Sequence, residues 1–358
     1  MCQSLGMTTA APGLDGVVAA QTRLSKVDGV AGRLWIAGYP VEEIAPHATF
    51  EEMCFLLWHD RRPAAAEAAA LRDGLRAAAL AAAPGRRGAT PMDTLRAGVA
   101  ALHGDDPETF VGAVPALVAH HRHDRPIAPS TELGHAANTL RMLRGADSTP
   151  REARALETNL NTVVDHGMNA STFTARVIAS TRSDLASAVT GAIGALKGPL
   201  HGGAPGPALA ALLALRDEPG DLGANTRAWA ARTIDAGERI MGFGHRVYEV
   251  RDPRADVLGT AAQEFLAGTG LYEDALTFEQ AVLEVLAAKK PGRSIQTNVE
   301  FYTALLLHGL GLDAELFSAV FAVGRVAGWI GHVLEQRREG RLLRPRAAYV
   351  GPLDRVWT

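Results

Sequence analysis

Met-Gly-Phe-Gly-His-Arg-Val-Tyr-Glu-Val-Arg-Asp-Pro-Arg, residues 241–254, is the stretch from which the rest of the chain is interpreted. Gly242 and Gly244 stand directly before His245, and glycine permits backbone angles that other residues avoid, so a tight turn presenting an imidazole is expected. Seven residues later, Asp252 and Pro253 are typical of a helix start, as cap and first helical residue.

Arg254 then falls in the first turn of that helix, where free N–H groups and the helix dipole favour an anion. His245 and Arg254 are therefore expected to face one small anionic site. The alternative is a structural histidine in a turn beside a solvated arginine.

Composition indicates a globular protein. The chain has 358 residues, 47% apolar and 21% charged, with a net charge of −3, which favours about two domains and offers no nucleic-acid-binding surface. Its two cysteines, Cys2 and Cys54, form neither a disulfide framework nor a metal-ligand pattern. With no signal peptide in view, we expect a cytoplasmic protein.

Residues 317–334 are mostly apolar and long enough to be a candidate membrane span. Arg325 lies near the centre, where it would cost about 2.5–3.5 kcal/mol on insertion scales. Small residues favour close helix packing instead: Gly324, Ala327, Gly328 and Gly331. We therefore expect a buried helix and no membrane contact.

Helical periodicity dominates the chain after residue 40, and the predicted fold class is mainly α. Residues 14–40 favour an irregular or β-hairpin entry segment. Helices are expected at 50–60, 63–83, 91–103, 107–121, 128–144, 150–166, from 171, 183–196, 208–215, 221–238, 255–267 and 276–288, and through 317–334. The cluster His120, His121 and His123 does not share one helix face, so a solvated helix end is expected there rather than a metal site.

Several further polar residues interrupt apolar or glycine-rich segments. His166 lies where one helix ends and another begins, and a helix-capping role is the alternative to a functional one. His201 lies on a glycine- and proline-rich turn before a helix, whose dipole disfavours the imidazolium form. Glu300 begins an apolar helix, and a buried Arg325 would need a carboxylate partner or an anionic ligand.

These residues suit one type of chemistry. A carboxylate can remove a proton next to a carbonyl while neutral histidines donate hydrogen bonds to the oxygens. Several arginines suit a substrate with more than one carboxylate. No metal or redox cofactor is required by the set.

At this point the chain resembles citrate synthase, including its relative 2-methylcitrate synthase, over nearly its whole length and in family order. The matching pieces are Leu14-Asp15-Gly16-Val17-Val18-Ala19 with Gly38-Tyr39, Asp165-His166 with Asn169-Ala170-Ser171-Thr172-Phe173, Gly198-Pro199-Leu200-His201-Gly202-Gly203, Gly242-Phe243-Gly244-His245-Arg246 with Asp252-Pro253-Arg254, Asn298-Val299-Glu300-Phe301-Tyr302, Gly324-Arg325 with Gly328-Trp329, and Arg344-Pro345-Arg346 with Tyr349-Val350-Gly351.

The resemblance implies an almost all-α homodimer with a large domain at 1–203, a small domain at 204–312 and the rest of the large domain at 313–358. It implies that acetyl-CoA and oxaloacetate are condensed to citrate, with the CoA thioester as substrate and no cofactor. The implied catalytic residues are His201, His245 and Glu300. The implied oxaloacetate ligands are His166, Arg254, Arg325 and, from the partner subunit, Arg344. CoA phosphates would meet Arg246, Lys290 and Arg293.

Two departures from the family pattern bear on function. Glu300 stands where the family usually has aspartate, so the carboxylate sits one methylene further out, and a misplacement near 1 Å can cost about 10²-fold in rate. The N-terminal extension of larger members is missing, which implies a plain dimer without NADH control. The alternatives left open are a 2-methylcitrate synthase acting on propionyl-CoA and a non-catalytic paralogue that binds CoA or a dicarboxylate.

Overall fold

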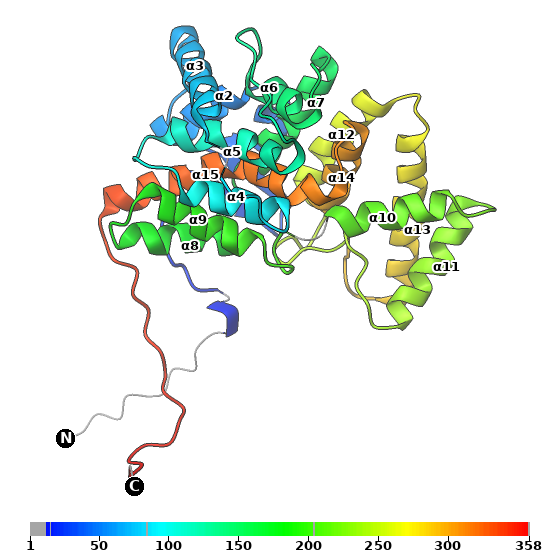
Figure 1. Ribbon diagram of the computed structural model, residues 1–358. Coiled ribbons are helices and arrows are strands. Elements are labelled where there is room, and N and C mark those ends of the chain that lie inside the picture. The colour runs from blue at the N-terminus through cyan, green and yellow to red at the C-terminus, as the bar shows by residue number, and fades with distance from the viewer. Residues whose placement is uncertain (1–11, 15, 84, 203–204, 357–358) are drawn as a thin grey trace.

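The computed structural model describes residues 12–14, 16–83, 85–202 and 205–356, and this part of the chain is almost entirely helical (Figure 1). The predicted all-α class is therefore confirmed. Cys2, Asp15 and Gly203, which the sequence analysis singled out, lie outside the described residues.

The only strands in the described ranges form a small antiparallel sheet near the N-terminus. It pairs β1 (Ser25–Asp28), β2 (Arg33–Ile36) and β3 (Tyr39–Pro40) in that order, as the predicted hairpin segment requires.

The helices follow in sequence, with 3-10 turns at Pro12–Leu14 and Ala314–Leu316. They are α1 (Val41–Ile44), α2 (Phe50–His59), α3 (Ala65–Ala81), α4 (Pro91–Ala100), α5 (Pro107–Arg122), α6 (His135–Arg144), α7 (Pro150–Val163), α8 (Ala170–Ser180), α9 (Leu185–Leu196), α10 (Pro205–Arg216), α11 (Leu222–Asp235), α12 (Pro253–Leu266), α13 (Leu271–Lys289), α14 (Val299–Gly309) and α15 (Phe317–Glu339).

Side-chain caps fix the helix starts that matter for the site. Asn169, Asp252 and Asn298 each accept a hydrogen bond from a backbone N–H in the first turn of α8, α12 and α14. At its other end, α15 continues past the predicted residue 334 to Glu339 and stops at Gly340, which takes the left-handed conformation that glycine tolerates.

Several predicted helix boundaries were wrong by three residues or more, and three of them have a local cause. α6 begins at His135 rather than 128, because the Asn138 side chain bonds Ser130 and Leu133 and holds the preceding segment as a loop. α7 ends at Val163, three residues early, since Asp165 is drawn into side-chain bonds. α13 begins at Leu271 rather than 276, after the left-handed Gly270.

The predicted solvated histidine cluster was also wrong in part. His120 and His123 lie at the end of α5, but their rings bond the carbonyl oxygens of Gly85 and Leu143, each at 2.9 Å, and His121 bonds Thr94 at 2.8 Å. The rings tie α4, α6 and the loop at Gly85 to the end of α5. No cluster suited to a metal ion is found among the described residues.

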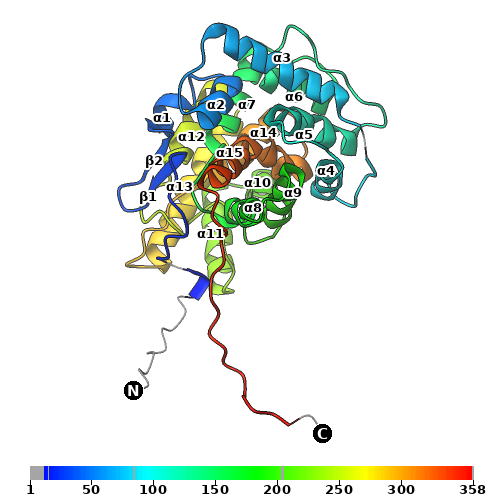
Figure 2. The same ribbon diagram turned by 90° about the vertical axis from the view of Figure 1, so that its left-hand side faces the viewer.

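α15 runs through the middle of the molecule, with α2, α5, α7, α8 and α9 packed around it (Figures 1 and 2). It is the one described helix that is long and apolar enough to cross a membrane, yet 89% of its most apolar window is buried inside the protein. Its apolar surface thus forms the core, as predicted. Gly324 and Gly328 let α15 approach the backbone of α7 at Leu160 and Val164.

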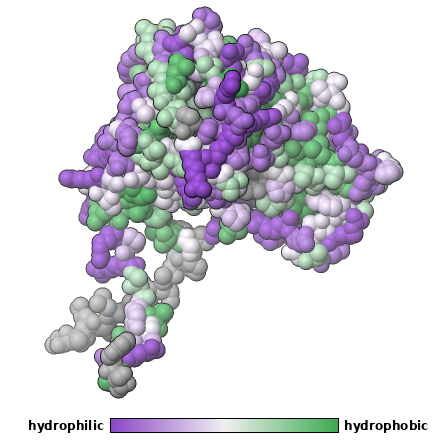
Figure 3. Space-filling view, viewed as in Figure 1, coloured by the Kyte–Doolittle hydropathy of each residue, from purple (hydrophilic) through white to green (hydrophobic). Residues whose placement is uncertain are grey.

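α10, α11 and α13 lie together on one side of the molecule, while α12 and α14 pack against α7 (Figure 1). The division into domains at 203 and 312 stays a prediction. After Gly340 the chain leaves the body as an extended tail that carries exposed apolar side chains (Figures 1 and 3). Among them, Val350 is 95% exposed and Leu353 75%.

We predict that Gly328→Ala destabilises the protein, because the added Cβ would meet the Val164 carbonyl oxygen well inside van der Waals contact. Overpacking of this kind costs about 1–3 kcal/mol. Gly194→Ala on α9 is the matched control, since nothing lies within 4 Å of its Cβ position. Urea unfolding should show a lower midpoint for Gly328→Ala and an equal or higher one for Gly194→Ala. Equal midpoints for both would contradict the close packing.

Candidate active site

Backbone pairing ties the turn before His245 to the segment before Glu300. Gly242 and Gly244 have φ of 86° and 81°, values that favour glycine. The Gly244 N–H donates to the Gln296 carbonyl at 2.7 Å, and the Asn298 N–H donates to the Gly242 carbonyl at 3.0 Å. The Asn298 side chain adds a bond to the Gly244 carbonyl at 2.8 Å. The expected turn is present, and it fixes His245 relative to Glu300.

Arg254 lies beside His245, as the sequence predicted. Arg254 is 3% exposed, and its Nη2 is 3.3 Å from His245 Nε2. Asp252 pairs with it through both oxygens, at 3.0 Å and 2.8 Å. The alternative of a solvated arginine is therefore wrong.

The bonds around His245 determine which ring nitrogen carries the proton. Its Nδ1 accepts from the backbone N–H groups of Val247 at 2.9 Å and Tyr248 at 3.1 Å. Burial, followed by the charge on Arg254, lowers the pKa of His245 to about 4. The neutral ring thus carries its proton on Nε2, the nitrogen beside Arg254. Two donors converge there, an arrangement suited to a carbonyl or carboxylate oxygen.

His166 lies on the other side of this pair. Its Nε2 is 3.1 Å from the Tyr248 hydroxyl, and its ring centroid is 5.5 Å from that of His245. Burial and then the charges of Arg254, His245 and Arg325 hold the pKa of His166 well below its usual value. His166 caps no helix here, because α7 has already ended at Val163.

His201 approaches from the loop before α10. Its Nε2 is 2.9 Å from the Ser171 hydroxyl, which also accepts a bond from Trp329 Nε1 at 3.0 Å. The pKa of His201 is lowered to about 4, first by burial and then by Arg325. The predicted low pKa holds, but its main cause is burial rather than the helix dipole.

Arg325 is a buried cation without a carboxylate partner among the described residues. It is 2% exposed, its Nε donates to the Val163 carbonyl, and its guanidinium lies over the Phe321 ring at 4.7 Å. Burial lowers its pKa to about 9. The sequence analysis expected Arg325 to have either a carboxylate partner or an anionic ligand. Since no carboxylate partner is found in the described chain, an anionic ligand is the alternative that is left.

Glu300 lies in the first turn of α14 and is half-buried. Burial raises its pKa to about 7, while the charge of Arg254 opposes this rise and Asp252 adds to it. Its carboxylate makes no hydrogen bond to the described part of the chain. It is therefore a carboxylate able to take or release a proton near neutral pH.

The remaining predicted residues lie outside this cluster. Arg344 is exposed on the tail, and Arg246, Lys290 and Arg293 are exposed on loops. Their roles stay predictions. Sequence reasoning missed Tyr248, although it lies three residues after His245, and gave no role to Ser171 or Trp329, although both stand inside the motifs quoted.

The sequence profile described as "Citrate synthase, C-terminal domain" matches residues 13–346. The chain belongs to the citrate synthase family. A citrate synthase of Haloferax volcanii is 36% identical, covering 97% of each chain, and a 2-methylcitrate synthase of Mycobacterium tuberculosis is 35% identical, covering 96% of this chain and 91% of that one. The predicted enzyme class, an acyltransferase of the citrate synthase type, is confirmed.

Solved citrate synthases share the fold. The enzyme of Thermotoga maritima superposes with a TM-score of 0.84 at 32% identity, covering 97% of each chain. That of Thermoplasma acidophilum, in a ternary complex with carboxymethyl coenzyme A and oxaloacetate, gives a TM-score of 0.84 at 30% identity, covering 97% of each chain.

We predict that Glu300 makes stability depend on pH. Its pKa rises from 4.5 in the unfolded chain to about 7, so folding favours the protonated form. The contribution is full below pH 4.5 and is lost as pH rises through 7. Relative to Glu300→Gln, the wild type should lose on the order of 2–3 kcal/mol of unfolding free energy across that window. Denaturant titrations at a series of pH values measure this, and a constant difference would contradict the raised pKa.

Proposed function

We propose that this protein condenses acetyl-CoA with oxaloacetate to give citrate and free CoA. The observation that carries the proposal is the convergence of His245 Nε2–H and Arg254 Nη2, 3.3 Å apart, beside a buried Arg325 that lacks a carboxylate partner in the described chain. Such an array suits the ketone oxygen and carboxylates of a small dicarboxylate.

The first step is removal of a proton from the acetyl methyl group. Glu300, with a pKa raised to about 7 by burial, is the base, and its proton affinity suits transfer near neutral pH. His201 donates a hydrogen bond to the thioester oxygen.

The enol carbon then attacks the ketone carbon of oxaloacetate, and His245 Nε2–H stabilises the oxygen as it gains charge. Arg254, Arg325 and His166 hold the carboxylates. Water finally attacks the thioester of the condensed product, breaking the C–S bond and releasing CoA. The CoA thioester is a substrate and protein groups supply each of these roles. We propose Arg246, Lys290 and Arg293 as contacts for the CoA phosphates.

A 2-methylcitrate synthase activity on propionyl-CoA is the second candidate, supported by the 35% identical relative of that name. One methylene is worth about 1–3 kcal/mol of discrimination in a pocket, so both acyl-CoAs deserve testing. The third reading, a non-catalytic binding paralogue, is disfavoured by the intact set of His201, His245 and Arg254.

We predict that free thiol appears from acetyl-CoA only when oxaloacetate is present, because the enol needs its acceptor. A thiol reagent measures the release, and propionyl-CoA run in parallel ranks the two acyl groups. If micromolar protein releases no thiol with either acyl-CoA and oxaloacetate, the synthase proposal fails and the binding paralogue is favoured.

We predict that Glu300→Gln lowers turnover by about 10²–10⁴-fold, the usual loss for a general base, while oxaloacetate still binds through Arg254 and Arg325. Glu300→Asp tests whether the site is adjusted to a side chain that is one methylene longer than aspartate. A drop in rate means that the backbone has adjusted to glutamate, and a rise means that it has not. An unchanged rate in Glu300→Gln would remove this residue from the mechanism.

We further propose a cytoplasmic homodimer in which the tail donates Arg344 to the partner's site. The support is the tail itself, which leaves the body of the molecule (Figure 2) and carries exposed apolar side chains together with the exposed Arg344. Mixing inactive Arg344→Ala with inactive His245→Ala chains should restore partial activity in heterodimers. Absence of rescue, with subunit exchange verified by mass, would mean that each site is built within one chain.

A further inference from the structure

One face of α15 serves several parts of the site at once. Arg325, Trp329, His332 and Gln336 follow one another at intervals of four, three and four residues, which places them on one side of a helix. Arg325 lies within the candidate site, and Trp329 donates to Ser171, the residue that contacts His201. His332 and Gln336 take no part in the chemistry proposed above.

His332 reaches the loop that carries His166. Its ring is fully buried, and Nε2 lies 3.1 Å from Asp165 Oδ1. On its other side, Nδ1 lies 3.2 Å from Nη1 of Arg176, a side chain on α8 that is also fully buried. His332 thus stands between a guanidinium and a carboxylate.

These contacts determine which nitrogen of the His332 ring carries the proton. A guanidinium only donates, so His332 Nδ1 must accept from Arg176, and the ring proton must be on Nε2, where it donates to Asp165. The second oxygen of Asp165 accepts from the Ser25 hydroxyl at 2.5 Å, and the Gly167 N–H donates to that same hydroxyl at 2.8 Å. The residues on both sides of His166 are therefore fixed.

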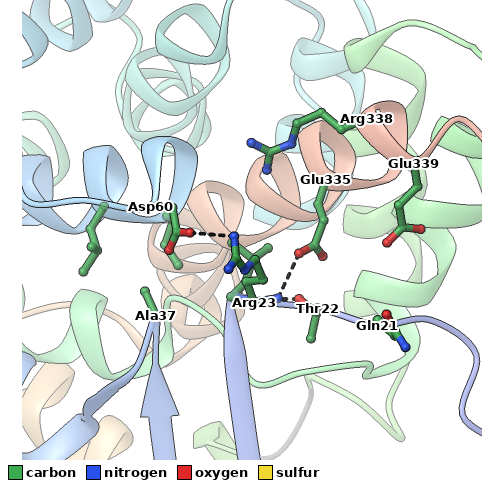
Figure 4. A pocket seen from close by; sticks show the side chains of 11 residues that line it. Gln21, Thr22, Arg23, Ala37, Asp60, Glu335, Arg338 and Glu339 are labelled. Carbon is green, nitrogen blue, oxygen red and sulfur yellow. Dashed lines mark hydrogen bonds and ion pairs between the residues drawn. The ribbon is translucent and has the colours of Figure 1, made fainter.

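Arg176 is anchored in turn by α15. It donates to Glu335 at 2.6 Å and to the Gln336 side chain at 2.9 Å. Glu335 also accepts the Arg23 N–H at 2.9 Å, beside a surface pocket of about 730 Å³ (Figure 4). Gln336 donates to the Arg341 carbonyl at 2.9 Å, where the tail begins.

Stability alone is a weak reason for such a network. Apolar replacements of buried ion pairs are often neutral or stabilising, since burying the charges costs several kcal/mol per ion. What an apolar core would not supply is a defined position for Asp165 and hence for the backbone of His166.

We propose that Arg176 and His332 are positioning residues that act through Asp165 to hold His166 in place for a dicarboxylate ligand. This inference rests on the proposed function, in which His166 binds oxaloacetate. Neither side chain touches the ligand. Their effect is on the affinity for oxaloacetate, separate from the acyl-CoA half of the site that Trp329 supports through Ser171.

The test compares His332→Leu, which removes both bonds, with His332→Gln, whose amide N–H₂ can replace the Nε2 donor. Calorimetry measures oxaloacetate binding without acyl-CoA. We expect at least a tenfold weaker Kd for His332→Leu and a Kd within about threefold of wild type for His332→Gln. Trp329→Phe is the matched control on the same helix face, with oxaloacetate binding kept and turnover reduced.

Asp165→Asn provides a second variant if His332→Leu does not fold. Its amide offers one acceptor oxygen to the two donors, His332 and Ser25, so oxaloacetate binding should again weaken. Folded variants of either kind with wild-type affinity would overturn the proposal, as would equal losses in His332→Leu and His332→Gln.

A readout independent of turnover separates this inference from the proposed function. Nitrogen-15 NMR of histidine-labelled, ligand-free protein should show the His332 proton on Nε2, and Arg176→Met should disturb the His166 resonance. A proton on His332 Nδ1, or an unmoved His166 signal in Arg176→Met, overturns the proposed positioning of His166 through Asp165, even if the protein is a citrate synthase. Failure of wild type to bind oxaloacetate overturns the proposed function instead.

Discussion

The buried ion pair between Arg254 and Asp252 is the interaction on which the rest of the candidate site depends. Asp252 caps α12, neutralises Arg254 with both oxygens, and accepts the Val299 N–H at 3.2 Å. One carboxylate therefore holds the first turn of α12 next to the first turn of α14. Removing one partner from such a pair typically costs about 3–5 kcal/mol, because the other charge is left buried.

The same pair shapes the proton affinities around it. Arg254 contributes to the low pKa of His245 and His166, and it opposes the rise that burial imposes on Glu300. A ligand carboxylate placed on Arg254 would screen that positive charge. The basicity of Glu300 would then increase, so that the base becomes stronger once an anionic acceptor is in place. Electrostatics alone thus favours proton removal after the dicarboxylate has bound.

Much of this arrangement was readable from local sequence. The turn at Gly242–Gly244, the cap at Asp252, and the apolar α15 with its glycines all have local signals, and the all-α class follows from helical periodicity along the chain. The predicted start of α6 was wrong because hydrogen bonds from the Asn138 side chain hold the preceding segment as a loop. The low pKa of His201 was expected, but its cause was misassigned, because burial depends on contacts between segments that are far apart in sequence.

The residues that sequence reasoning missed share one property. Tyr248, Ser171 and Trp329 carry no charge and stand in patterns that an ordinary core would also show. Only their partners, His166 and His201, reveal a connection to the site. Arg176 and His332 were missed for a related reason, since their partners lie about 160 residues away in sequence.

The place of α15 in the chain has a consequence for how the protein acquires its fold. It is the last helix of the described chain and also its central one, so the helices around it have no common core until residue 339 has been made (Figure 2). On the ribosome, α2, α5, α7, α8 and α9 emerge first with their inner faces uncovered. The core is therefore completed only after α15 has emerged, and until then the helices made before it need protection from aggregation.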